Sequence, residues 1–228
     1  MTNKIISLIT VFLLLTHGMS NVALSQSSTK YSVLRYNGVE THILKSSGNN
    51  IDISMESSVK SLKTRISENK GIAGINASFY NMNNRKPCGL LIINGKIISK
   101  NVYNRPYIVV GEKSYISDSN VLVPQIKSAV GGGSYLLKNG RTYITNNHFS
   151  SQFVNSRVRR TCIGIDGNGS ILMVVIKGAS IKQASDIMKK LNCTDAMALD
   201  GGTSSQMYYN GKYIVSSNRR VPVILITR

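Results

Sequence analysis

Short runs of apolar residues recur along most of the chain, and turn-forming residues separate them. The clearest case is residues 90–93 and 96–99, which flank the dipeptide Asn94-Gly95. Asn-Gly favours the two-residue turn of an antiparallel hairpin because both residues accept a positive φ. The same pattern recurs at Asn139-Gly140, at residues 166–169 and at Asn210-Gly211. It therefore predicts a β-rich chain that is built largely from hairpins.

Two segments have the period of an amphipathic helix instead. Residues 58–70 place apolar side chains on one face, and Gly71 follows as a C-terminal cap. The second helix begins after Ser180, and Gln183 completes a capping box there. Its apolar face consists of Ile181, Ala184, Ile187, Met188 and Leu191. We therefore expect an α+β fold, with β-rich mixed sheets and two main helices in a single domain.

Asp200 breaks the strand pattern at the end of an apolar run, residues 196–199. The segment that follows it directly is Gly201-Gly202-Thr203-Ser204-Ser205. Adjacent glycines let backbone N–H groups converge on one point, and the hydroxyls add donors, which together favour anion binding. A plain Gly-rich turn that Asp200 caps is the alternative.

A second polar segment, residues 76–81, also follows an apolar run. It holds Asn76, a serine and two aromatic residues, Phe79 and Tyr80. Amide and hydroxyl groups beside aromatic rings are suited to gripping a sugar. A turn whose aromatic side chains enter the core is equally consistent with the pattern. Residues 145–158 are polar and irregular, which predicts a surface loop that contacts ligand.

The chain is strongly basic. Among its 228 residues, 28 Lys and Arg oppose 10 Asp and Glu, which gives a formal charge of +18. Such a charge favours anionic partners. The few carboxylates argue against a calcium cage or a two-metal site. Because no nucleic-acid-binding motif is present, we expect a phosphorylated glycan or sugar phosphodiester rather than nucleic acid. We expect no metal or other cofactor, although a divalent cation stays an open alternative.

Residues 1–25 have the pattern of a cleaved signal peptide. Lys4 precedes an apolar stretch that ends at Thr16, and Ala23-Leu24-Ser25 offers small residues for cleavage. An uncleaved anchor is the alternative, but the stretch is short for a bilayer crossing. We therefore expect a secreted or periplasmic protein of residues 26–228, without a membrane span. It keeps 27 basic and 10 acidic residues, a charge of +17; its oligomeric state is not predicted.

The cysteines and histidines show no metal-ligand spacing. Cys88, Cys162 and Cys193 allow one disulfide, or all three can be free thiols, and we prefer a buried free thiol for Cys162. His42 and His148 lie far apart in the sequence. A Ser204–His148–Asp200 triad stays an alternative, but the chain has no G-x-S-x-G elbow.

Several motifs, in this order, resemble the phosphodiester glycosidase family. They cover roughly residues 70–228 and are Gly74-Ile75-Asn76-Ala77-Ser78-Phe79-Tyr80, Gly89, Asn94-Gly95, Arg105-Pro106, Gly131-Gly132-Gly133, Arg160-Thr161, Ile163-Gly164-Ile165 and Leu199-Asp200-Gly201-Gly202-Thr203-Ser204-Ser205. Thr203 stands where this family often has a third glycine, and Ser134 where proline is common. The resemblance implies hydrolysis of a glycosyl phosphodiester.

Asp200 is the best-placed carboxylate for that chemistry. Asp166 is expected to be a turn residue, and Asp186 occupies a polar position on a predicted helix. Ordinary glycosidases use two carboxylates. A departing phosphate needs little protonation, so one carboxylate that acts at the anomeric carbon, directly or through water, can suffice. Positive charge and N–H donors must then stabilise the departing oxygens.

We expect Asp200 and Arg160 to be catalytic, with Arg160 and the Gly-rich turn on the phosphate. Arg157 and Arg159 read as solvated charges. The expected substrate-binding residues are Asn76, Phe79, Gly132, Gly201, Gly202, Ser204 and Ser205, with Asn76 on the sugar hydroxyls. The favoured function is an exported hydrolase that releases sugar from a surface or secreted glycan. The alternatives are a non-catalytic module that binds phosphorylated polysaccharide, and a basic protein that docks on anionic envelope polymer.

Overall fold

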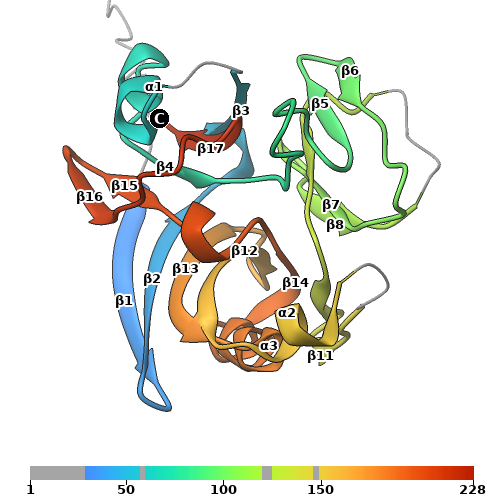
Figure 1. Cartoon of the computed structure of the whole chain (residues 1–228), viewed down its shortest axis with the longest axis vertical. Coiled ribbons are helices and arrows are strands. Elements are labelled where there is room, and N and C mark those ends of the chain that lie inside the picture. The colour runs from blue at the N-terminus through green and yellow to red at the C-terminus, as the bar shows by residue number, and fades with distance from the viewer. Residues whose placement is uncertain (1–28, 57–59, 120–124, 146–148) are drawn as a thin grey trace, which may run out of the picture.

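The computed structural model describes residues 29–56, 60–119, 125–145 and 149–228. The expected signal peptide and His148 lie outside these ranges. The described residues form three antiparallel sheets and three α-helices, which agrees with the expected β-rich α+β fold (Figure 1). The helices are α1 (Leu62–Glu68), α2 (Ser151–Asn155) and α3 (Ile181–Lys190).

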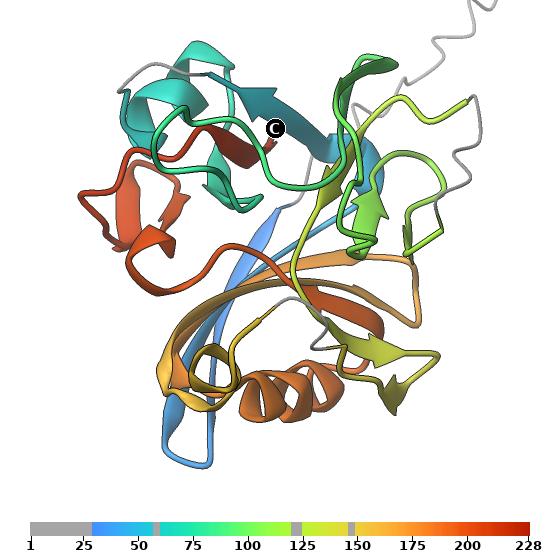
Figure 2. The same cartoon turned by 45° about the vertical axis from the view of Figure 1, so that its right-hand side comes forward.

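The largest sheet has seven strands in the order β1-β2-β13-β12-β14-β10-β11. Its strands are β1 (Lys30–Tyr36), β2 (Val39–Ser46), β13 (Ile171–Ala179), β12 (Val158–Asp166), β14 (Cys193–Ala198), β10 (Tyr135–Lys138) and β11 (Arg141–Thr142). Helix α3 packs its apolar stripe on one face of this sheet, as Figure 2 shows. The long strands β12 and β13 form the centre of the sheet. Arg160 and Thr161 lie in β12.

Two smaller sheets cover the opposite face of the seven-stranded sheet (Figures 1 and 2). One has the order β16-β15-β4-β17-β3, with β16 (Lys212–Val215), β15 (Met207–Tyr209), β4 (Ala73–Asn76), β17 (Val223–Thr227) and β3 (Ile51–Met55). The other has the order β6-β5-β9-β7-β8, with β6 (Lys96–Ser99), β5 (Leu91–Ile93), β9 (Ala129–Gly131), β7 (Tyr107–Val109) and β8 (Tyr115–Ser117).

One apolar core joins the three sheets into a single domain. It contains Met173 from the seven-stranded sheet, Leu225 from the second sheet and Ile108 from the third, and all three are fully buried. Burial of large aliphatic side chains contributes roughly 1.5–3 kcal/mol each. The core therefore fixes the relative positions of β4 and β14, whose ends carry the two polar segments.

The predicted hairpins are present, with the Asn of each Asn-Gly pair at positive φ. The φ angles are 51° at Asn94, 50° at Asn139 and 44° at Asn210. The hairpin between β12 and β13 is also confirmed. There Asp166 accepts hydrogen bonds from the backbone N–H groups of Asn168 and Ser170, so it is the turn residue that the sequence predicted.

The helices differ in part from the prediction. Helix α3 and its Ser180 capping box are confirmed, whereas α1 is shorter than residues 58–70 because Ser61 caps it and accepts a hydrogen bond from Thr64 N at 3.1 Å. The expectation of a loop over residues 145–158 is wrong for its second half. Ser150 caps α2 by accepting from Phe153 N at 3.2 Å, which supplies the third helix.

All three cysteines are free. Cys162 and Cys193 are buried in the core beneath α3, and burial raises the pKa of each thiol to about 12. The disulfide that the sequence allowed is therefore absent, and the buried thiol expected at Cys162 is confirmed. Within the described ranges, no helix has both the length and the hydropathy that a bilayer crossing needs.

Candidate active site

Asp200 lies two residues beyond the end of β14, where the chain leaves the seven-stranded sheet. Its backbone N–H donates to the carbonyl of Ala77 at 2.9 Å, which joins the end of β14 to the segment after β4. The short 3-10 helix η2 (Gly202–Ser204) follows at once. Gly202 has φ +62°, a conformation that glycine adopts without strain. The two polar segments of the sequence therefore meet at Asp200.

The environment of Asp200 makes its carboxyl group unusual. Burial raises its pKa to about 6, although the hydrogen bond from the Ser204 side chain, the charge of Arg219 and the backbone N–H of Gly201 act in the opposite direction. A carboxyl group with this pKa changes charge near neutral pH, which is typical of groups that act in acid–base or nucleophilic catalysis. Ser204 and Gly201 therefore contact the Asp200 carboxyl group, whereas their expected contact with substrate stays a prediction.

A buried polar network holds the backbone of Asp200. Asn76 is 0% exposed, and its Nδ2 donates to the carbonyl of Asp200 at 2.6 Å. Its Oδ1 accepts from Gln206 N at 3.1 Å and from Thr161 Oγ1 at 2.9 Å, and Thr161 Oγ1 also lies 3.0 Å from Ser205 Oγ. We therefore correct the expectation that Asn76 and Ser205 hold sugar hydroxyls: both are buried and support the turn that carries Asp200.

Replacing Asn76 tests this supporting role. Asn76→Ala leaves buried donors and acceptors without partners, so we expect the free energy of unfolding to fall by about 3 kcal/mol. Urea unfolding at constant pH measures the change. Asn168→Ala, which truncates an exposed asparagine in a turn, should change it by less than about 0.5 kcal/mol. Equal changes in the two variants would contradict the role of the network.

Arg160 is also internal, which corrects its expected role as the phosphate ligand. It is 1% exposed; Nε donates to Ala179 O at 2.9 Å, and Nη2 donates to Phe153 O at 2.6 Å and Ser156 O at 2.8 Å. The guanidinium carbon lies 4.7 Å from the centre of the Phe153 ring. Nη1 has no partner among the described residues but is inaccessible to solvent. Arg160 therefore ties α2 to the sheet.

Gly132 is a packing glycine in this structure. It is buried, and its N–H donates to Pro106 O at 2.8 Å. A Cβ atom at this position would lie 2.5 Å from the carbonyl oxygen of Ala198, two residues before Asp200. The glycine therefore permits the close approach of this segment to β14. This geometry replaces the expected direct contact of Gly132 with substrate.

Phe79 contributes to an aromatic wall that Phe149 and Phe153 complete. The ring centres of Phe79 and Phe149 are 5.4 Å apart, and those of Phe149 and Phe153 are 4.6 Å apart. The Arg105 guanidinium lies 5.5 Å from the Phe79 ring and 4.9 Å from the Phe149 ring. Phe79 is only partly buried, so its ring does not fall fully into the core. The wall offers apolar ring faces together with positive charge.

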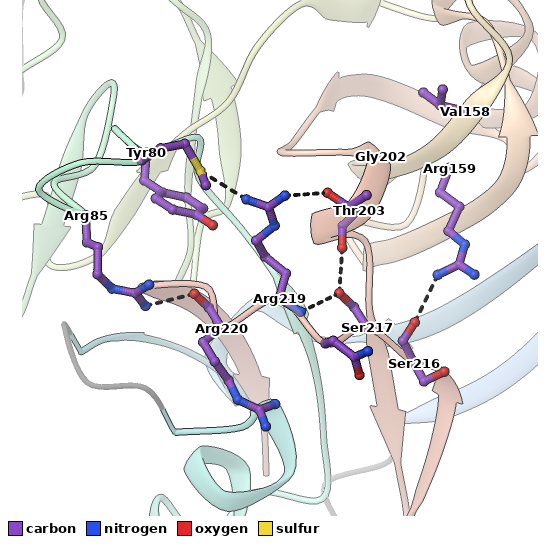
Figure 3. Close-up of a pocket in the computed structure, with 12 residues that line it drawn as sticks. Tyr80, Arg85, Val158, Arg159, Gly202, Thr203, Ser216, Ser217, Arg219 and Arg220 are labelled. Carbon is purple, nitrogen blue, oxygen red and sulfur yellow. Dashed lines mark hydrogen bonds between the residues drawn. The ribbon is translucent and has the colours of Figure 1, made fainter.

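A groove of about 970 Å³ opens beside Asp200, and Gly202 and Thr203 form part of its wall (Figure 3). None of the described residues that line it is acidic. Four arginines line it: Arg85, Arg159, Arg219 and Arg220. The sequence did not predict this groove. Arg159 was expected to be a solvated charge, and the other three arginines belong to no motif, although Arg219 and Arg220 are adjacent in the sequence.

The central arginine of the groove is held in place beside the Asp200 turn. Arg219 Nη2 donates to Thr203 Oγ1 at 3.0 Å, and Ser217 Oγ donates to Thr203 O at 2.5 Å (Figure 3). On the other side, Arg159 Nη1 donates to Ser216 O at 2.9 Å. The two contacts of Thr203 join η2 to Ser217 and Arg219, and the Arg159 contact joins β12 to Ser216. They place positive charge next to the Asp200 carboxyl group before any substrate is bound.

The described residues contain no group of three or more His, Cys, Asp and Glu side chains that could hold a metal ion. Glu40 and His42 are paired on β2, 3.2 Å apart. None of the interactions that shift the pKa of Asp200 comes from a second acid. The arrangement that the residues do form is a cationic groove next to one carboxyl group.

One partly buried carboxyl group beside a preformed cationic groove is a site of the class that enzymes use for anionic substrates. The sequence that forms this site also matches a family model. The chain belongs to the phosphodiester glycosidase family, whose model matches residues 69–227. The resemblance drawn from the ordered motifs is thereby confirmed.

Individual relatives agree with this assignment. The chain is 24% identical over 164 residues to mouse N-acetylglucosamine-1-phosphodiester alpha-N-acetylglucosaminidase, which covers 60% of this chain and 31% of the mouse protein. The chain thus spans about a third of that relative. The solved catalytic domain of the zebrafish enzyme, auto-inhibited by its pro-peptide, has a TM-score of 0.73 at 16% identity and covers 92% of this chain and 85% of its own.

Two bacterial structures are similar as well. A protein of Synechocystis has a TM-score of 0.70 at 17% identity, covering 88% of this chain and 62% of its own. A Burkholderia pseudomallei protein described as exported has a TM-score of 0.62 at 13% identity, covering 83% and 74%. At these identities the structural matches establish the fold alone.

Proposed function

We propose that this protein is an exported hydrolase that cleaves a glycosyl phosphodiester in a surface or secreted glycan and releases the sugar. The observation that carries the proposal is the Asp200 carboxyl group, with a pKa of about 6, next to the arginine-lined groove. Membership of the phosphodiester glycosidase family supports the reaction class.

The proposed reaction breaks the bond between the anomeric carbon and the phosphate oxygen, and the electron pair leaves with the phosphate. In one route Asp200 attacks the anomeric carbon and forms a glycosyl ester, which water then hydrolyses to release the sugar and restore the carboxylate. In the other route Asp200 removes a proton from the water that attacks the anomeric carbon. Arg219 and the backbone N–H groups of Gly202 and Thr203 stabilise the negative charge on the departing phosphate. Because a phosphate monoester is a good leaving group, this route needs no second acid.

The positions of the other carboxylates support the assignment of Asp200. All ten acidic residues of the chain lie in the described ranges. None of the other nine lines the groove. Seven of these nine form ion pairs, namely Glu40, Asp52, Glu56, Glu68, Asp118, Asp166 and Asp186. Burial raises the pKa of the Asp200 carboxyl group, and the charge of Arg219 acts on it.

The released sugar is proposed to lie on the side of Asp200 that faces the aromatic wall. Phe79 lies three residues after the end of β4, and Ala77 in the same segment accepts the Asp200 backbone hydrogen bond. Partly buried ring faces bind the apolar face of a pyranose ring. The phosphate is proposed to lie at Arg219, whose charge acts on the Asp200 carboxyl group.

Hydrolysis of a defined panel tests the proposal. The purified protein is incubated with UDP-N-acetylglucosamine and other sugar 1-phosphodiesters, with and without EDTA. We expect free sugar, with the phosphate retained on the other product. Release of sugar 1-phosphate instead would make the protein a phosphodiesterase. An absence of turnover across the panel would favour the non-catalytic alternative.

That alternative, a module that binds phosphorylated polysaccharide, is supported by the excess of arginines over carboxylates in the groove. Binding without turnover that weakens steeply as salt is added would favour it. Turnover that persists in moderate salt would favour the hydrolase.

Secretion or residence in the periplasm is part of the proposal. It rests on the signal-peptide pattern of residues 1–25 and on the similarity to a protein described as exported. Fractionation of the source cells, with detection in the medium and in the periplasm, tests this placement. Retention in the cytoplasm would contradict it.

A further inference from the structure

Arg105 is a half-buried cation that no carboxylate of the chain neutralises. All ten acidic residues lie in the described ranges, and none of their ion pairs includes Arg105. Its Nε is inaccessible to solvent and has no hydrogen-bond partner among the described residues. Burial lowers the pKa of the guanidinium, and no carboxylate is among the groups that act on it. Because a buried charge without a counter-charge is unfavourable, a bound anion would stabilise this position.

The guanidinium of Arg105 lies at the aromatic wall. Its central carbon is 5.5 Å from the centre of the Phe79 ring and 4.9 Å from the centre of the Phe149 ring. A Cβ atom on Gly133 would lie 2.9 Å from the Phe79 ring and 3.0 Å from the Phe149 ring, so both rings pack against this glycine. Gly133 N donates to the carbonyl of Ala198, the last residue of β14, at 2.7 Å. Arg105 is therefore placed at the proposed sugar position, close to the end of the strand that leads to the candidate carboxyl group.

A small cavity of about 90 Å³ lies beside Arg105. Tyr135 lines it and is 1% exposed, and the hydroxyl of this tyrosine has no hydrogen-bond partner among the described residues. Burial raises the pKa of Tyr135, so the hydroxyl stays protonated and can donate. Asp118 also lines the cavity, but Lys138 Nζ lies 3.7 Å from its Oδ1 and balances its charge. Whole ligands occupy pockets of about 300–1,000 Å³, so this cavity has room for one substituent and not for a second sugar ring.

We propose that the sugar bound at the aromatic wall carries a carboxylate, and that Arg105 binds this carboxylate. The inference rests on the proposed function. A planar guanidinium can donate two parallel hydrogen bonds to a carboxylate, and the Tyr135 hydroxyl is a further donor in the cavity wall. One unpaired positive charge matches one negative charge, which favours a carboxylate over a dianionic phosphate. The substrate class is therefore a phosphodiester of an acidic sugar, such as a hexuronic acid.

Two matched pairs of substrates test the carboxylate. UDP-glucuronic acid and UDP-glucose differ only at C6, where a carboxylate replaces a hydroxymethyl group. UDP-galacturonic acid and UDP-galactose give the same comparison for the other configuration at C4. We expect the acidic member of at least one pair to have a kcat/KM at least about tenfold above that of its neutral partner, because a charge-assisted hydrogen bond forms in a half-buried site. Arg105→Gln should abolish this preference and leave kcat/KM for the neutral member within about twofold.

Two further variants serve as controls. Arg105→Lys keeps the charge but loses the paired donors, so it should retain part of the preference for the acidic sugar. Lys212→Gln removes the same charge at an exposed position of β16, an edge strand of another sheet, and should leave the preference unchanged. Turnover of the neutral sugar by Arg105→Gln shows that this variant is folded.

Three results would overturn the inference: equal kcat/KM within each pair for the unmodified protein, a preference that persists in Arg105→Gln, or an equal loss on both members of a pair in that variant. In each case the proposed hydrolase function still stands. If none of the four compounds is turned over, the other sugar 1-phosphodiesters of the panel decide the proposed function. Calorimetric binding of the four compounds then decides the inference: tighter binding of an acidic sugar that Arg105→Gln abolishes would support it, and equal affinities within each pair would refute it.

Discussion

Asp200→Asn lowers kcat/KM for a sugar 1-phosphodiester by at least about 10³-fold, to background. The amide keeps the size of the side chain, but it can neither attack an anomeric carbon nor accept a proton from water. Steady-state kinetics of the two proteins on one substrate measures the loss. Retained turnover in this variant would remove Asp200 from the mechanism.

If Asp200 is the catalytic carboxylate, the kcat/KM of the unmodified enzyme should depend on pH through the ionisation of Asp200. Both routes need the ionised carboxylate, and burial raises the pKa of Asp200 to about 6. The value of kcat/KM should therefore rise about tenfold per pH unit below pH 6 and become constant above it. A profile that falls on passing from pH 5 to pH 7 would instead indicate a protonated acid.

The stability of Asp200→Asn supplies the control for folding. The pKa of Asp200 is about 6 in the folded state and about 3.9 when unfolded, so between these values the folded protein binds the extra proton. The free energy of unfolding then falls as pH rises from about 4 to about 6, by about 3 kcal/mol in all, and is constant above that range. Asparagine does not ionise, so the variant does not lose this free energy of unfolding as pH rises. The variant should be more stable than the unmodified protein above pH 7 and similar to it below pH 4.

Arg160→Met lowers the free energy of unfolding by about 3–5 kcal/mol. Methionine fills a similar volume but leaves the carbonyl groups of Ala179, Phe153 and Ser156 without their buried donors. Urea unfolding at pH 7 measures the effect. Arg157→Met, which changes an exposed arginine three residues earlier, should alter stability by less than about 0.5 kcal/mol.

The same variant separates a structural Arg160 from a phosphate ligand. A structural residue changes stability and leaves the KM of the surviving folded enzyme within a few-fold. A variant that is as stable as the unmodified protein, with KM for phosphodiesters raised more than about 100-fold, would restore the role that the sequence suggested. The buried contacts of Arg160 lead us to expect the first result.

The hairpins and the helix caps were predictable because their causes are local. A positive φ at Asn94 and a Ser180–Gln183 capping box depend on residues within a few positions of one another. The placement of Asp200 was predictable for a similar reason, since a carboxylate that follows a buried strand and precedes two glycines stands out in the sequence. Gly202 and Ser204 then lie beside it by chain connectivity.

The errors share one physical cause. Asn76 and Arg160 are polar residues within or beside apolar runs, and from the sequence alone their side chains look available for a ligand. Their partners come from elsewhere in the chain: Asp200 is 124 positions from Asn76, and Ala179 is 19 positions from Arg160. The helix α2 was missed because its anchor, the Arg160 contact with Phe153, lies in the next strand.

The sequence by itself therefore determined the β-rich α+β class, the positions of the turns, the family motifs and the identity of the one exceptional carboxylate. Only the tertiary structure decided which polar residues face the site. Arg219 and Thr203 meet across 16 positions, and Arg85 meets Arg220 across 135, so no local pattern reveals the groove. Backbone preference acts over a few residues, whereas burial and electrostatic potential sum over all neighbours in space. For that reason the elements could be predicted locally, but the binding surface could not.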